Sequence, residues 1–242
     1  MKMKICWMYH DLMDLYGDKG NIQVLKTRCL DRGIECVVDT CSLGEDKDLS
    51  DYDLLFIGGG ADKEQAMLVD DLLSRKENIQ KAMDENTFVL LICGGYQMFG
   101  QYYIDGDGNK IEGLHFFDYY TESSSREDRC IGNILVEAVI DNKTYKVLGF
   151  ENHGGQTKNV SSPLGKVIVG SGNSYHCGTE GFYNGKVLGT YMHGPLLPKN
   201  PEIADLIITK ALSKRHENVC LEALDDTLEN KAKQVMIDRI MK

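Results

Sequence analysis

Apolar residues in the first half of the chain form short blocks that alternate with longer amphipathic stretches. The blocks are typical of buried parallel strands and cover Lys4–His10, Glu35–Cys41, Leu54–Ile57 and the run from Phe88 to Cys93. Two stretches between them have helical periodicity, Asn21–Arg32, where Gly33 is a stop signal, and Lys63 to about Glu85. This repeated strand–helix–strand order predicts a mostly parallel central sheet with helices on both faces.

The second half consists mainly of strand-like segments separated by turns. The predicted strands are Ile134–Ile140, Tyr145–Asn152, Lys166–Gly170 and Val187–Met192, and we expect antiparallel strands to be added here. Helices are predicted again at Pro201–Arg215 and Glu229–Ile240, the second with an apolar face made of Ala232, Val235, Met236 and Ile240. No linker or internal repeat divides the chain, so we expect a single α/β domain over residues 1–242.

The composition narrows the class of function. With 42% hydrophobic and 26% charged residues, the chain has the composition of an ordinary globular protein. A formal charge of −10 argues against nucleic-acid binding, and no apolar run is long enough to span a membrane. The eight cysteines are dispersed, with no CxxC pair and no signal sequence, which favours reduced thiols in the cytoplasm over disulfides. No spacing of histidines and cysteines predicts a metal site.

The segment Cys93-Gly94-Gly95 directly follows an apolar strand and precedes a helix-compatible pattern. A side chain at such a turn is held on a strained backbone, and the glycines let another molecule approach closely. The N–H groups and dipole of the following helix favour a thiolate over a thiol. This arrangement predicts a nucleophilic cysteine, although free cysteines are also commonly buried for structural reasons.

A thiolate nucleophile needs a base, usually a histidine from elsewhere in the fold. His193 follows a second apolar strand and is the first candidate, while His153 competes for the same reason. The glycines at 58–60 end another strand, and their N–H groups with that of Gly94 could form an oxyanion hole. The same loop could instead bind a phosphate, but no phosphate-binding loop of the Gly-x-x-x-x-Gly-Lys-[Ser/Thr] kind occurs.

Several motifs in a fixed order resemble those of class I glutamine amidotransferases, in the branch related to cobyric acid synthase. They are Phe56–Gln65, Cys93–Gln97, Gly149–Gly155 and Tyr191–Pro195. Three further segments extend a closer resemblance, over nearly the full length, to the glutaminase subunits of lipid II isoglutaminyl synthases: Leu15–Asn21, Asp118–Ser123 and Gly194–Asn200. The resemblance implies a three-layer, flavodoxin-like amidotransferase fold.

The resemblance also implies a reaction and a division of labour. Glutamine would be hydrolysed to glutamate and ammonia, with Cys93 as nucleophile, His193 as proton carrier, and Gly59, Gly60 and Gly94 around the oxyanion. A partner resembling the MurT ligase would bind ATP, Mg²⁺ and the lipid II muropeptide and use the ammonia to make D-isoglutamine. No cofactor is then expected in this chain. The complex would work in the cytoplasm or at the inner face of the membrane.

The resemblance leaves two assignments open. Ordinary members carry a glutamate two residues after the histidine, but that position is Pro195, so Asp18 or, as runner-up, Glu151 would orient His193. Arg129 aligns with the arginine that binds the α-carboxylate of glutamine, with Arg126 as the neighbour that could be confused with it. Gln97 would also contact the substrate.

Alternatives from other classes remain at this point. The cysteine turn alone also fits a γ-glutamyl hydrolase or a peptidase on the same fold, or the glutaminase of another amidotransferase system. A flavodoxin-like binding module that grips a phosphate with residues 58–60 is the non-enzymatic alternative.

Overall fold

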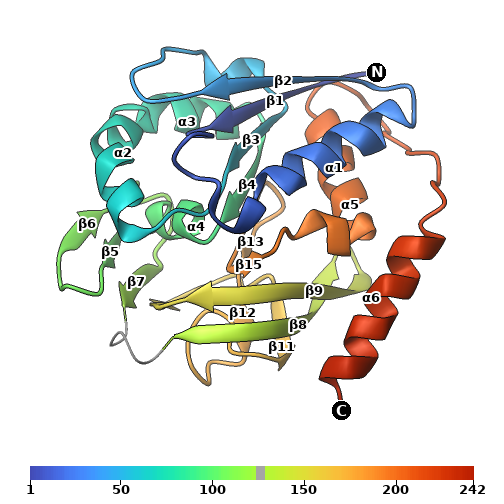
Figure 1. Ribbon diagram of the computed structural model, residues 1–242. Coiled ribbons are helices and arrows are strands. Elements are labelled where there is room, and N and C mark those ends of the chain that lie inside the picture. Colours follow the sequence, from blue (N-terminus) through green and yellow to red (C-terminus); the bar gives the residue numbers. More distant parts are fainter. Residues whose placement is uncertain (124–128) are drawn as a thin grey trace.

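A six-stranded sheet forms the centre of the molecule in the computed structural model, which describes residues 1–123 and 129–242. Its strand order is β13-β14-β4-β3-β1-β2, and every neighbouring pair from β14 to β2 is parallel (Figure 1). The bounds are β1 (Lys2–Met8), β2 (Glu35–Cys41), β3 (Leu54–Ile57), β4 (Phe88–Ile92), β14 (Val187–Thr190) and the antiparallel edge strand β13 (Phe182–Tyr183). The predicted parallel sheet is confirmed.

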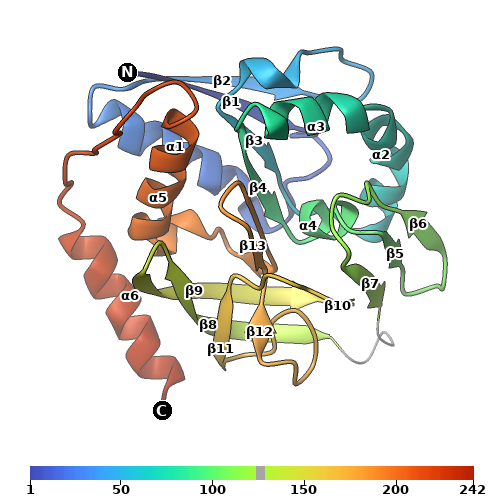
Figure 2. The same ribbon diagram turned by 180° about the vertical axis from the view of Figure 1, so that it is seen from behind.

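Helices cover both faces of this sheet (Figures 1 and 2). On one face lie α1 (Lys19–Leu30) and α5 (Pro201–Leu212), and on the other α2 (Asp62–Ser74), α3 (Lys76–Asp84) and the short α4 (Gly94–Met98). The single helix predicted from Lys63 to Glu85 is wrong, because the chain leaves helical geometry at Arg75. Arg75 there reaches the carboxylate of Asp71 and the carbonyl of Ser42, and α3 starts in a new direction.

A larger antiparallel sheet lies beneath the parallel one in the view of Figure 1, and a smaller, mostly antiparallel sheet lies at the left. The larger has the order β12-β11-β8-β9-β15, and the smaller the order β10-β7-β5-β6, which contains one parallel pair, β5 with β7. Their strands are β5 (Tyr102–Ile104), β6 (Lys110–Glu112), β7 (Tyr120–Ser123), β8 (Cys130–Ile140), β9 (Lys143–His153), β10 (Gly155–Lys158), β11 (Gly165–Val169), β12 (Thr179–Glu180) and β15 (Met192–His193). Short 3₁₀ turns cover Leu15–Gly17, Leu49–Asp51 and Leu197–Lys199.

The strand predicted at Val187–Met192 is divided between two sheets. β14 ends at Thr190 in the parallel sheet, whereas Met192 and His193 pair with β9 in the larger antiparallel sheet. The buried carboxylate of Glu180 fixes this crossing, since it accepts hydrogen bonds from the hydroxyl of Thr190 (2.6 Å) and the N–H of Tyr191 (2.8 Å). Glu180 therefore fixes the point at which the chain leaves the parallel sheet, two residues before His193.

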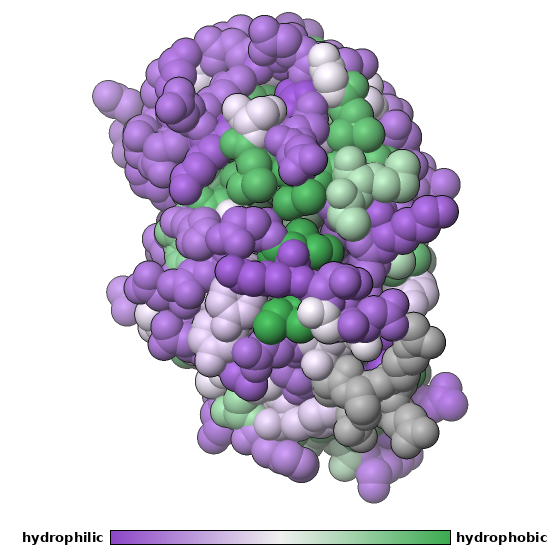
Figure 3. Space-filling model, turned by 90° about the vertical axis from the view of Figure 1, so that its left-hand side faces the viewer, coloured by the Kyte–Doolittle hydropathy of each residue, from purple (hydrophilic) through white to green (hydrophobic). Residues whose placement is uncertain are grey.

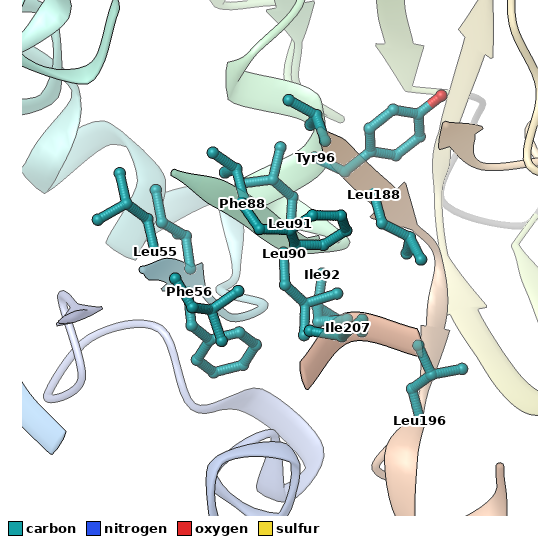
Figure 4. Packing of buried hydrophobic residues seen from close by; sticks show 14 of the residues in the cluster. Leu55, Phe56, Phe88, Leu90, Leu91, Ile92, Tyr96, Leu188, Leu196 and Ile207 are labelled. Carbon is teal, nitrogen blue, oxygen red and sulfur yellow. The ribbon is translucent and has the colours of Figure 1, made fainter. Parts of the chain in front are cut away.

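The core lies between the parallel sheet and its helices. Side chains of β3, β4 and β14 pack with Tyr96 of α4 and Ile207 of α5 (Figure 4). Each fully buried large apolar side chain contributes roughly 1.5–3 kcal/mol. The packing is close enough that Gly189 is required, because a Cβ at this position would lie 2.4 Å from the ring of Tyr96. The strand that leads to His193 is thus seated directly on the helix that follows Cys93.

The last helix, α6 (Thr227–Ile240), stands apart at the C-terminus (Figure 1). The apolar face predicted for it is wrong, since Val235 is 59% exposed while Lys233 and Ile237 are buried. Charge explains the difference. Lys233 pairs with Glu202 of α5, and Asp226 at the helix start pairs with the buried Arg28 of α1, so ion pairs set the rotation of the helix.

The face of the molecule that carries α2 is mostly hydrophilic, with apolar side chains reaching the surface near its centre (Figure 3). Among the helices described, none is both long enough and apolar enough to cross a bilayer.

Candidate active site

Cys93 occupies the turn between β4 and α4, at the carboxyl end of the central strand. Its backbone is in an unusual conformation, with φ of 48° and ψ of −102°, a combination that non-glycine residues rarely adopt. The turn is held by hydrogen bonds from the Cys93 N–H to the Thr190 carbonyl (2.8 Å) and from the Gly95 N–H to the Gly58 carbonyl (3.2 Å). The predicted strained turn is thus present.

His193 and Asp18 form a buried pair beside this turn. The imidazole Nδ1 lies 3.4 Å from Asp18 Oδ2, and both side chains are fully shielded from solvent. The same Asp18 oxygen accepts a hydrogen bond from the Gly59 N–H at 2.7 Å, which fixes the carboxylate. Asp18 comes from the loop before α1, more than 170 residues from His193 in the sequence.

Gly59 is the point where the three groups meet. A Cβ at this position would lie 2.6 Å from His193 Cε1, 3.1 Å from Asp18 Oδ2 and 3.5 Å from Cys93 Cβ. The structure therefore brings Cys93, His193 and Asp18 together around Gly59. Any side chain at 59 would occupy the space that the imidazole now fills.

The electrostatics of the pair favour a protonated imidazole. Burial lowers the pKa of His193, but the negative charge of the Cys93 thiolate and the contact with Asp18 outweigh it and raise the pKa to about 10. A proton on His193 is thus held next to the sulfur and the carboxylate. A histidine held in this way beside a thiol is the partner that a nucleophilic cysteine needs.

The two alternative residues have other contacts. Glu151 accepts hydrogen bonds from the N–H groups of Ser171 (2.7 Å) and Gly172 (2.9 Å), so its carboxylate is used by the loop between β11 and β12. The His153 ring stacks on Tyr191, with centroids 3.7 Å apart, and its Nδ1 lies 2.7 Å from the Gly155 carbonyl. Neither contact places Glu151 or His153 in the position that Asp18 and His193 occupy around Gly59.

The glycine loop differs from the predicted oxyanion hole in one donor. The N–H of Gly59 is already bonded to Asp18, so it cannot also bind an oxyanion. The N–H groups of Gly60 and Gly94 have no acceptor within the described ranges 1–123 and 129–242 and remain available next to Cys93. If an oxyanion binds here as predicted, Gly60 and Gly94 are the available donors, whereas Gly59 supports the carboxylate of Asp18.

A cavity of about 570 Å³ opens in front of Cys93. Its lining brings together Cys93, Gly60, Gln97 and Arg129, four of the residues predicted from the sequence. The guanidinium of Arg129 donates to Oδ1 of Asn152, another lining residue, at 3.0 Å. Arg126, the alternative to Arg129, lies outside the described residues. A volume of this size is ample for an amino acid.

A buried chain of polar groups forms the floor of the cavity. Gln97 accepts a hydrogen bond from Gln65 Nε2 (3.1 Å) and donates to the hydroxyl of Tyr191 (3.1 Å), which is 2.6 Å from Thr157 Oγ1. Gln97 thus has its amide fixed in one orientation. Sequence reasoning missed Gln65 and Tyr16 as lining residues, although both lie within motifs quoted for the family resemblance.

No group of three or more histidine, cysteine, aspartate or glutamate side chains that could hold a metal ion occurs in the described part of the chain. The cavity is instead lined by the thiol of Cys93, the backbone of Gly60 and the guanidinium of Arg129, and the His193–Asp18 pair lies beside the Cys93 turn. Together with the doubly covered parallel sheet, they define a cysteine-dependent α/β hydrolase.

Comparison with known proteins identifies the family within this class. Residues 4–201 match the model of the CobB/CobQ-like glutamine amidotransferase domain, and the chain belongs to this family. It is 40% identical to the lipid II isoglutaminyl synthase (glutamine-hydrolysing) subunit GatD of Streptococcus pneumoniae, over 94% of this chain and 87% of that one. The identity to the GatD subunit of Staphylococcus aureus is also 40%, over 96% of this chain and 95% of that one.

The fold comparison agrees with the family. A crystal structure of a glutamine amidotransferase superposes with a TM-score of 0.53 and covers 85% of this chain and 98% of its own, at 12% sequence identity. The α/β amidotransferase fold and the family inferred from the sequence motifs are thereby confirmed.

Proposed function

We propose that this chain is the glutaminase subunit of a lipid II isoglutaminyl synthase and releases ammonia from glutamine at Cys93. The observation that carries the chemistry is the convergence of Cys93, His193 and Asp18 on Gly59. The substrate system follows from the similarity to two GatD subunits, each over more than nine-tenths of this chain.

The site accounts for each step of the hydrolysis. The Cys93 thiolate, whose proton His193 has taken, attacks the side-chain carbonyl carbon of glutamine. The resulting oxyanion is bound by the N–H groups of Gly60 and Gly94. The C–N bond breaks as the imidazolium gives its proton to the departing ammonia. Water then adds to the thioester, with His193 again taking a proton, and glutamate and the thiol are regenerated.

Asp18 and Arg129 have supporting roles in this scheme. Asp18 holds the imidazole orientation and stabilises its positive charge, as a third member of the triad does. Arg129 binds the α-carboxylate of glutamine, because a guanidinium can donate two parallel hydrogen bonds to a carboxylate. Gln97 borders the substrate from the cavity floor.

The proposal extends to the partner and the compartment. A Mur-ligase-like subunit of the MurT type would bind ATP and Mg²⁺, activate the α-carboxyl of D-glutamate in lipid II and accept the ammonia. Such a complex would work in the cytoplasm, at the membrane surface where lipid II is exposed. What supports this division is the naming of the GatD relatives as subunits of a glutamine-hydrolysing synthase.

The test is reconstitution with the Mur-ligase-like protein encoded in the same genome. We expect ammonia release from glutamine, and amidation of lipid II that requires both subunits and ATP. Cys93→Ala and His193→Ala should each reduce ammonia release by more than about 10³-fold while binding to the partner persists. Full glutaminase activity in Cys93→Ala would contradict the chemistry. Amidation with glutamine by the ligase alone would contradict the role of this chain.

A further inference from the structure

Tyr16 lies in the site but has no role in the hydrolysis as proposed above. It lies in the turn before Asp18, lines the cavity together with Cys93, and has a φ of 57°, in the left-handed region that non-glycine residues seldom adopt. Uncommon backbone conformations of this kind concentrate at functional sites. Two contacts of the side chain, one from the ring and one from the hydroxyl, indicate what Tyr16 does.

The ring of Tyr16 seats the catalytic imidazole. The centroids of the Tyr16 and His193 rings are 5.2 Å apart and the planes meet at 79°, an edge-to-face contact. Asp18 holds one nitrogen of the same imidazole, so the ring of Tyr16 adds a second constraint on its orientation. His193 is fully buried although Tyr16 itself is 44% exposed, which places Tyr16 at the outer edge of the site.

The hydroxyl of Tyr16 is tied to the carboxylate-binding side of the cavity. Arg129 can only donate, so the amide of Asn152 must turn its Oδ1 toward Arg129 Nη2, at 3.0 Å. The amide nitrogen of Asn152 then faces Tyr16 and donates to its hydroxyl oxygen at 2.7 Å. In this arrangement the tyrosine oxygen is an acceptor, and its own proton has no acceptor within residues 1–123 and 129–242.

We propose that Tyr16 is a specificity-determining residue that joins Arg129 in binding the α-carboxylate of the substrate while its ring positions His193. This inference rests on the proposed glutaminase function. A carboxylate beside Arg129 accepts the free O–H of Tyr16, and the bond from Asn152 makes that O–H a better donor. One side chain therefore links recognition of the amino-acid end of glutamine to the orientation of the base at its amide end.

The two roles can be separated by substitution. Tyr16→Phe keeps the ring and removes the hydroxyl, so we expect KM for glutamine to rise about 5- to 20-fold with kcat within about twofold of the wild type. Tyr16→Leu removes the ring as well, and kcat should then fall by at least about tenfold. Tyr183→Phe is the matched control, because its hydroxyl has no partner among the described residues and it lies outside the cavity lining.

The substrate analogue 4-aminobutyramide, which is glutamine without its α-carboxylate, tests the assignment directly. The kcat/KM for this analogue should be the same in Tyr16→Phe as in the wild type, whereas that for glutamine falls. Asn152→Ala should also raise KM for glutamine, and Tyr16→Phe should raise KM less in this background than in the wild type, because Asn152 no longer strengthens the O–H of Tyr16 as a donor. All assays use the full chain with its partner subunit.

The outcomes separate this inference from the function on which it rests. A wild-type complex that releases no ammonia from glutamine would overturn the proposed function and the inference with it. An active wild type in which Tyr16→Phe leaves KM for glutamine unchanged, or weakens turnover of 4-aminobutyramide equally, would overturn the inference alone.

Discussion

Replacing Gly59 by alanine tests the geometry of the site more directly than removing a catalytic side chain. The added methyl group would lie 2.6 Å from His193 Cε1, whereas ordinary contact begins at 3.4 Å. The imidazole is fully buried between Asp18 and Tyr16, so it must shift by nearly an ångström away from Gly59 and lose its present alignment with Asp18. A misplacement of about 1 Å can lower the rate about 10²-fold, equivalent to about 2.7 kcal/mol of barrier.

The assay is steady-state ammonia release from glutamine, with the free energy of unfolding measured on the same samples. We expect Gly59→Ala to lose about 10²-fold in kcat and to remain folded. Gly33→Ala is the control, because Gly33 has a φ of +66° and open space around it. That variant should be about 1 kcal/mol less stable than the wild type and should keep the wild-type kcat. If Gly59→Ala kept wild-type kcat, the placement of His193 against this backbone would be refuted.

Three further predictions concern charge. Asp18→Asn should lower kcat about 10²- to 10⁴-fold. The wild type should lose stability as pH rises from about 6.5 toward 10, because in this range His193 holds its proton only in the folded state, and Asp18→Asn should reduce that loss. Denaturant titrations along this pH range measure the difference. Glu180→Gln should remove the decline in wild-type stability between about pH 4.5 and 7, because burial raises the pKa of this carboxyl to about 7; equal slopes in the two proteins would contradict that cause. Arg28→Ala should cost about 2–4 kcal/mol of unfolding free energy and expose α6 to proteases, since Asp205 and Asp226 lose their shared partner; unchanged proteolysis would show that α6 is held otherwise.

The parts of the fold that could be predicted are those determined by local pattern. The bounds of β2 and β3 are as predicted, because each is a compact run of β-forming residues. The face of α6 could not be predicted, since it depends on Lys233 meeting Glu202 and Asp226 meeting Arg28, contacts far apart in the sequence. The passage of the chain between sheets at Tyr191 likewise depends on Glu180, which no periodicity indicates.

In the site, too, features set by local pattern could be predicted, whereas features set by contacts between distant residues could not. Cys93 could be found from the strand–glycine turn alone, but the choice of His193 and Asp18 needed the family resemblance as well. The use of the Gly59 N–H by Asp18 had no signal in the sequence, because the bond spans 41 residues. Tyr16 was missed for the same reason, since its partner Asn152 is 136 residues away.

The crossing of the chain at Tyr191 has a consequence for control of the enzyme. Cys93 is anchored to the parallel sheet, whereas His193 is a member of the antiparallel sheet built on β9. The proposed nucleophile and the proposed proton carrier therefore belong to two different sheets, which are joined at Tyr191. We infer that a partner that binds across the junction of these two sheets would change turnover by changing their spacing, without contacting glutamine, Cys93 or His193.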